Sequence, residues 1–73
     1  MKWVSPYLLV GTEDDALFLG DPFIDNSNAA KFAIRSLHQP VVVPTVEIAA
    51  DTLRLLGYEE EWVMAHVLSD WEE

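Results

Sequence analysis

The chain has 73 residues, with 13 acidic side chains, four basic ones and no cysteine, which gives a net charge of −9. This length allows a single domain, residues 1–73, and the missing cysteine excludes a disulfide framework, a zinc ribbon and a cysteine nucleophile. Because so acidic a surface repels phosphates and anionic lipid head groups, we expect no direct binding to nucleic acid or to membranes.

Hydrophobic residues make up 51% of the chain, so apolar burial can stabilise a compact core without disulfides or metals. No apolar run approaches the roughly 18 residues that a membrane span requires. The first residues resemble the start of a signal peptide, but Pro6 interrupts them and no small-residue cleavage site follows. We therefore expect a soluble, unprocessed, cytoplasmic protein.

The N-terminal part predicts a β-hairpin. Residues 3–10 are rich in Trp, Val, Tyr and Leu, which favours a strand, and Pro6 makes that strand an edge or bends it. A polar, Gly-containing stretch, residues 11–15, separates it from a second apolar run, residues 16–19. Two such runs joined by a short loop are typical of a hairpin, so we expect them to pair.

A helix and a short apolar segment follow. Residues 25–28 are helix N-cap types, and from residue 29 apolar side chains recur at helical spacing. Pro40 ends this helix, since the residue before a proline avoids the α region. Residues 41–43 are three valines, which form either a third strand, parallel to a neighbour, or an extended connector.

The C-terminal part predicts a helical hairpin. Thr45 is a suitable N-cap for a helix over residues 45–56, and Gly57 is a suitable C-cap. The wide apolar surface of this helix predicts a central position, covered on two or three sides. A last helix follows over residues 59–70, with an inward stripe formed by Val63, Met64, Val67, Leu68 and Trp71.

These elements predict a small α+β domain. We expect an N-terminal β-hairpin, with or without a short third strand, packed against three α-helices in the order β-β-α-(β)-α-α.

Trp62 is out of register with the inward stripe. At about 100° per residue it projects away from Val67, on the face that carries His66. It is either an exposed aromatic anchor ringed by acids, of the kind that dominates protein–protein interfaces, or part of a second core face. On the first interpretation the residues that contact a partner are Trp62, His66, Glu59, Glu60 and Glu61, followed by Glu13, Asp14 and Asp15.

Acidic residues form three clusters: residues 13–15, residues 59–61, and Asp70 with Glu72 and Glu73. On a common face they would imitate the phosphates of a nucleic acid and fit a basic groove. Taken singly, they are typical of a solvated turn, a helix N-terminus and a tail. The sequence leaves these alternatives open.

The sequence contains no signature of catalysis, metal binding or cofactor binding. His38 and His66 lack metal-ligand spacing, and His66 with Asp70 would supply only two ligands. The serines lie in no nucleophile elbow, and there is no Gly-rich phosphate loop. We therefore expect no enzyme, no metal site and no cofactor.

These features together predict a stoichiometric binding protein: an inhibitor that occludes the basic, nucleic-acid-binding surface of a partner protein. Small size, high negative charge and missing catalytic groups are typical of phage-encoded antagonists of host defence, which act in the cytoplasm of the host cell. The alternative is a structural or assembly subunit that self-associates through the apolar helix of residues 46–56. Both a monomer and a homodimer remain open.

Overall fold

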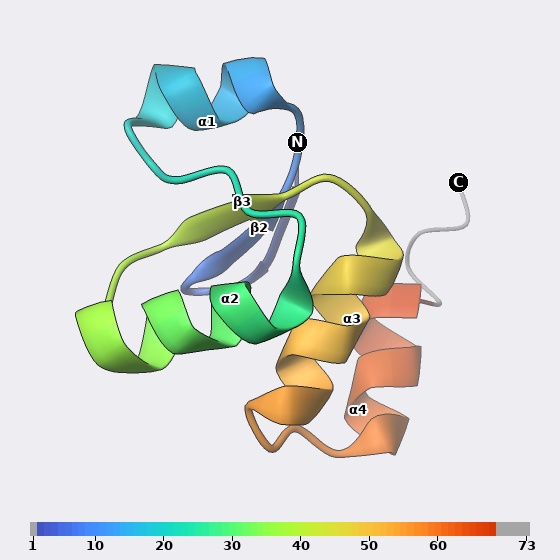
Figure 1. Ribbon diagram of the computed structural model, residues 1–73. Helices are drawn as coiled ribbons and strands as arrows, with labels where there is room; N and C mark the ends of the chain where they lie inside the picture. The colour runs from blue at the N-terminus through green and yellow to red at the C-terminus, as the bar shows by residue number, and fades with distance from the viewer. Residues whose placement is uncertain (1, 69–73) are drawn as a thin grey trace.

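Helices lie on both faces of a three-stranded sheet in the computed structural model, which describes residues 2–68 (Figure 1). The predicted α+β class with an N-terminal β-hairpin is confirmed, and the optional third strand is present. No helix among these residues is long and apolar enough to cross a membrane. In chain order the elements are β1 (Lys2–Ser5), β2 (Leu8–Val10), α1 (Glu13–Leu19), α2 (Ser27–Phe32), η1 (Ala33–Leu37), β3 (Val41–Val43), α3 (Val46–Leu55), α4 (Glu60–Val63) and η2 (Met64–Leu68). The segments η1 and η2 are π-helical continuations of α2 and α4. The predicted order with three helices is wrong by one element, because α1 is a further helix between the hairpin and α2.

The β-hairpin lies entirely within residues 2–10. β1 pairs antiparallel with β2, and the turn between them contains Pro6. A proline is tolerated there because its missing N–H removes no ladder hydrogen bond. The prediction that residues 16–19 form the second strand is therefore wrong: one predicted strand contains the whole hairpin.

Residues 13–19 form a helix, α1, rather than a strand, because local hydrogen bonds cap both ends of this helix. The Thr12 N–H donates to Asp15 Oδ2 (2.9 Å), and the Asp15 N–H donates to Thr12 Oγ1 (3.2 Å), which is a capping box. Gly20 ends the helix in the left-handed region, with a φ of 77°. These local bonds override the strand tendency of the apolar run.

Of the two alternatives for the three valines, the structure shows the strand, β3. It pairs parallel with β2, with Val42 opposite Leu9. Along its other edge the Ile24 N–H donates to the Val42 carbonyl (2.8 Å), and the Val42 N–H donates to the Pro22 carbonyl (2.9 Å). Phe23 therefore lies in a β-bridge with Val42. The side chains of β3 are fully buried because Val41 and Val43 face the main core while Val42 faces the second, smaller core.

The main core lies between one face of the sheet and the helices α2, α3 and α4. α3 contacts α2, α4, η2 and the sheet, so the prediction of a central helix covered on several sides is confirmed. Thr45 is its N-cap, with Oγ1 accepting from the Ile48 N–H at 3.2 Å. The fully buried side chains of this core are Leu8, Val41, Val43, Ala30, Ala49, Leu53, Val63 and Val67.

The predicted boundaries of α2 with η1 and of α3 also agree with the structure, whereas the predicted end of the last helix at residue 70 lies outside the described residues. Asn26 is the N-cap of α2, and η1 ends before Pro40. Between α3 and α4, the Gly57 N–H donates to the Arg54 carbonyl and the Tyr58 N–H donates to the carbonyl of Leu53, both at 3.0 Å. This pair of bonds is a Schellman motif. Its left-handed residue is Gly57, with a φ of 103°.

The opposite face of the sheet packs against α1, as Figure 1 shows. Residues paired across strands project to the same side, so this face carries a row that consists of Trp3, Leu9, Val42 and Phe23. Ala16 and Leu19 of α1 cover the middle of the row and form a second, smaller core with Leu9 and Val42. Trp3 and Phe23, at the two ends of the row, remain partly exposed.

Candidate functional site

Trp62 lies on α4, at the opposite end of the molecule from α1 (Figure 1). Its side chain is half-buried and packs against the main core. Val63 and Val67 fill the contact beneath the helix, as predicted, whereas Met64 is half exposed. Trp71, the last residue of the predicted stripe, lies outside the described residues. Trp62 thus combines the two predicted alternatives, with one part on the core and another open to solvent.

The indole of Trp62 contacts two neighbouring rings. The imidazole of His66 stacks on it, with ring centroids 4.6 Å apart and planes 16° apart, and the ring of Tyr58 is tilted by 51° at a centroid distance of 5.0 Å. His66 Nδ1 lies 3.0 Å from the Trp62 carbonyl oxygen. Because a carbonyl can only accept, Nδ1 donates, which leaves Nε2 for a contact with another molecule.

The three glutamates that begin this helix differ in their roles. Glu60 accepts two hydrogen bonds from Arg54, from Nε to Oε1 at 2.7 Å and from Nη2 to Oε2 at 3.0 Å. Arg54 Nη1 also donates to Asp51 Oδ1 at 2.8 Å. The hydrogen bond from Arg54 lowers the pKa of Glu60, and the same bond raises the pKa of Arg54. All three glutamates are exposed, but Glu60 links α4 to α3 through its ion pair with Arg54.

A shallow cleft of about 470 Å³ adjoins these groups on the outer side of the helix. Its lining includes Glu61 and the half-exposed side chain of Met64. Glu61 and Met64 lie about 100° and 200° around the helix axis from Trp62, so this cleft is on a different side of α4 from the aromatic rings. We define the α4 surface as the residues Tyr58, Glu59, Glu61, Trp62, Met64 and His66.

The acidic residues of α1 do not extend this surface. Asp15 accepts from the Thr12 N–H in the capping box, whereas Glu13 and Asp14 are exposed. Because α1 and α4 lie at opposite ends of the molecule, the clusters of residues 13–15 and 59–61 are not adjacent. The third cluster, residues 70–73, lies outside the described residues. Two of the three predicted clusters therefore form no continuous acidic patch.

The sequence reasoning missed an exposed apolar pair on α1. Leu17 and Phe18 are 81% and 83% exposed, on the side of the helix away from Ala16 and Leu19. The prediction of a strand over residues 16–19 concealed this arrangement. A signal was present, because Thr12 followed three residues later by an acid and then by an apolar run is a capping-box pattern.

Residues 2–68 contain no group of three or more His, Cys, Asp or Glu side chains that could hold a metal ion. Every buried side-chain nitrogen or oxygen in this range has a hydrogen-bond partner; for example, the Thr52 hydroxyl donates to the Ile48 carbonyl at 2.8 Å. Comparisons with protein-family models, with curated proteins and with solved structures found no match. A function for this chain therefore has to follow from its own residues and their geometry.

Proposed function

We propose that this protein is a non-catalytic protein-binding module, an inhibitor that uses its α4 surface to occlude a basic surface of a partner protein. One observation carries this proposal. The rings of Tyr58, Trp62 and His66 form two successive contacts from the turn before α4 into η2, and the same segment carries the exposed side chains of Glu59 and Glu61.

The ring contacts favour binding because they restrict the side chains in advance. Trp62 packs against the core and stacks on His66, so it has little rotamer freedom left to lose when a partner covers it. Trp and Tyr also dominate the binding free energy of many interfaces. A Lys or Arg of the partner placed over an aromatic face gains a further cation–π attraction.

The charge of the chain supports a basic partner. A net charge of −9 accelerates encounter with a cationic surface and repels nucleic acid itself. Clusters of Lys and Arg are typical of nucleic-acid-binding surfaces, so we infer that the occluded surface is of this kind. The same small size and negative charge support the finer proposal of a phage-encoded inhibitor of host defence that acts in the cytoplasm of the host.

The test is affinity capture from a bacterial lysate, with elution by a salt gradient and identification by mass spectrometry. The wild-type bait is expected to retain a basic, nucleic-acid-binding protein. Two variants, Glu59→Gln/Glu61→Gln and His66→Ala, are expected to weaken the purified complex about tenfold or more. All three positions are exposed, so the fold is expected to persist, which circular dichroism checks.

Matched controls separate the α4 surface from the overall charge. Asp25→Asn/Glu47→Gln removes two exposed carboxylates elsewhere, and His38→Asn replaces the other histidine at a left-handed position (φ 53°) that Asn tolerates. Both control variants are expected to bind the partner with unchanged affinity. Equal weakening by the two double variants would assign the binding to net charge alone, and failure to capture any basic protein would contradict the proposed function.

The alternative function, self-association through α3, has less support. Ala49, Ala50 and Leu53 of this helix are buried against other elements of the same chain, which leaves Leu55, 40% exposed, as a contact for a second copy. We expect size-exclusion chromatography with light scattering to show a monomer. A homodimer that Leu55→Ser dissociates would favour the assembly subunit instead.

A further inference from the structure

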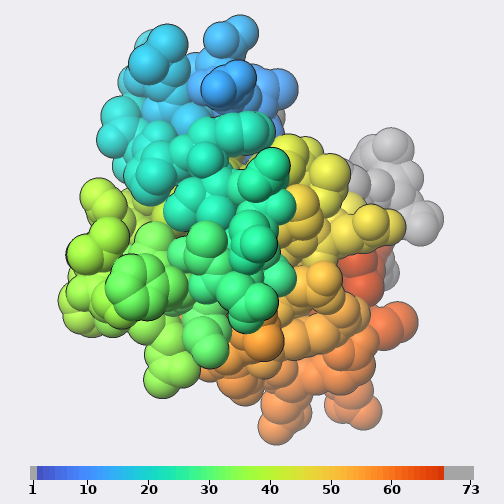
Figure 2. All heavy atoms as spheres, viewed as in Figure 1, coloured from blue at the N-terminus to red at the C-terminus, as the bar shows by residue number. Residues whose placement is uncertain are grey.

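α1 carries two large apolar side chains on its solvent side. Leu17 and Phe18 are more than 80% exposed, whereas Ala16 and Leu19 make the contact of this helix with the sheet. Figure 2 shows the atoms of this segment projecting at one end of the molecule, at the top of the view. Single exposed apolar side chains are ordinary, but adjoining ones with a polar rim are typical of interaction sites.

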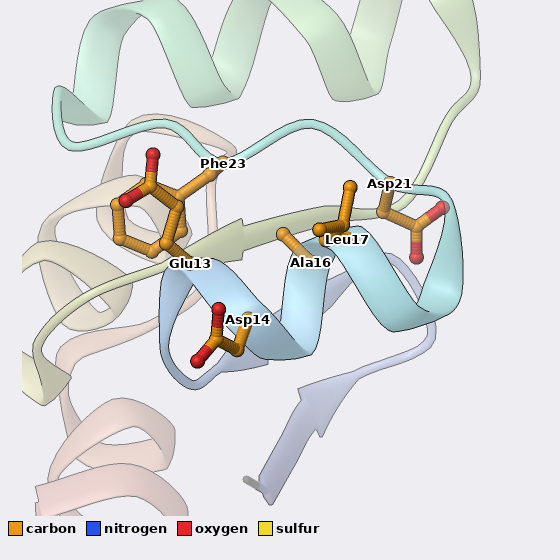
Figure 3. Close-up of a pocket in the computed structure, with 6 residues that line it drawn as sticks. All are labelled: Glu13, Asp14, Ala16, Leu17, Asp21 and Phe23. Carbon is orange, nitrogen blue, oxygen red and sulfur yellow. The ribbon is translucent and has the colours of Figure 1, made fainter.

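A cleft of about 300 Å³ adjoins Leu17, between α1 and the segment that follows it. Figure 3 shows Ala16 and Leu17 in its middle, with Glu13 and Phe23 toward one end and Asp21 at the other. The backbone of Phe23 pairs with Val42 at the edge of β3, so the Phe23 side chain projects to the same side of the sheet as Val42, toward α1. A cleft of this volume is at the small end of ligand pockets, so it suits inserted side chains better than a substrate.

The surroundings of this cleft are acidic. Residues 11–30 contain five acidic residues and no Lys, Arg or His. Asp15 is used by the capping box, but Glu13, Asp14 and Asp21 line the cleft. An apolar centre with an anionic rim is complementary to apolar side chains accompanied by cations.

We propose that the α1 surface, defined as Leu17, Phe18 and the cleft, docks a cationic amphipathic segment of another protein. Apolar side chains of that segment cover Leu17 and Phe18. An Arg or Lys enters the cleft, with its methylene stem along Phe23 and its charged head among the carboxylates. This docking needs no residue of the α4 surface, so it stands independently of the proposed function.

A second copy of this chain does not fit the α1 surface. A two-fold contact would bring the same patch of both copies together, and Glu13, Asp14 and Asp21 would then face their own counterparts. Each copy also carries a net charge of −9, so the pair would repel over a longer range. The occupant that the charges favour is a cationic one.

The test is an NMR titration of the ¹⁵N-labelled full chain with a synthetic helical peptide that has Leu on one face and Arg on the other. Amide shifts are expected to concentrate in residues 13–23. The double variant Leu17→Ser/Phe18→Ser is expected to lower the affinity for the peptide about tenfold or more, because it removes the apolar centre of the α1 surface. Both positions are mostly exposed, so the variant is expected to fold.

Three controls make the outcome decisive. Phe32→Ser removes an aromatic ring that is 63% exposed on α2, across the sheet, and is expected to leave the affinity unchanged, as is Glu59→Gln/Glu61→Gln on the α4 surface. A peptide with Glu in place of every Arg is expected not to bind. The proposal is overturned by equal binding of both peptides, by shifts centred on α4, or by no shift at millimolar Leu–Arg peptide. A dimer of the free protein that the Leu17→Ser/Phe18→Ser variant dissociates would equally overturn it.

Discussion

Leu53→Ala and Leu17→Ala remove the same three carbon atoms from two opposite environments. Leu53 is fully buried where α3 meets the main core, and Leu17 is 81% exposed on α1. At about 0.8 kcal/mol for each buried carbon group, the transfer of the Leu53 side chain from water accounts for about 2.4 kcal/mol. The cavity left behind raises the expected loss to about 3–5 kcal/mol. For Leu17, of which about a fifth is buried, the same reasoning gives about 0.5 kcal/mol.

The two expected losses are easily separated in a domain of this size. Its total free energy of unfolding is expected to be about 4–11 kcal/mol, so Leu53→Ala removes roughly half of it. Urea unfolding followed by tryptophan fluorescence and far-UV circular dichroism measures both variants. With a slope of about 1–3 kcal/mol per molar urea, the midpoint falls by more than about 1 M for Leu53→Ala and by less than about 0.5 M for Leu17→Ala.

Equal losses in the two variants would refute the assignment of Leu17 to the solvent side of α1. If the stability lost in Leu17→Ala grows with protein concentration, a second copy covers α1, and the proposal of a cationic partner there is wrong. A small loss in Leu53→Ala would mean that α3 is not the centre of the core.

Three further predictions concern single interactions. Hydrogen bonding from Arg54 lowers the folded-state pKa of Glu60 below its usual value of 4.5, so Glu60 stabilises the fold above that pH and the effect disappears as the pH falls through the folded-state pKa. Thermal melts of Glu60→Gln are therefore expected to lie below wild type at pH 7 and to converge with it in acid; a constant difference would contradict the pairing. Gly57→Ala is expected to lower the free energy of unfolding, measured in urea, by about 1–2 kcal/mol, because a φ of 103° disfavours any Cβ although the surrounding space is open. An unchanged urea midpoint would contradict the Schellman geometry. Thr12→Ala removes the N-cap and is expected to destabilise α1 by about 0.5–2 kcal/mol, which faster amide hydrogen exchange in α1 would show. Unaltered exchange would argue against the capping box with Asp15.

The helix boundaries were largely predictable because caps and breakers act between residues a few positions apart. Asn26 and Thr45 accept hydrogen bonds from backbone amides three residues further on, and Gly57 takes the left-handed conformation that ends α3. The same kind of signal existed at Thr12, just before residues 16–19, for which a strand was predicted, so that error came from weighting the apolar run above the cap. Hydrophobic spacing likewise predicted that Val63 and Val67 face the core.

The candidate site was predicted only in part. Trp62 and His66 do adjoin each other, because residues four positions apart lie on one side of a helix. Glu60, however, is engaged by Arg54 of the preceding helix, and Asp15 is engaged by its own cap. The chain around Glu60 does not reveal its partner, since that bond depends on how α3 and α4 pack.

The sequence by itself determined the fold class, the main helices and the strong negative charge, because these depend on composition and on bonds between near neighbours. The tertiary structure decided where the hairpin turns, since strand pairing depends on contacts between segments distant in the chain. It also decided that β3 lies between β2 and the backbone beside Phe23, and that α1 and α4 lie at opposite ends of the molecule. Each helix covers the part of the sheet where its own apolar side fits, and that choice depends on all the other elements at once. For this reason the two apolar and acidic surfaces are separate, although the sequence contains both.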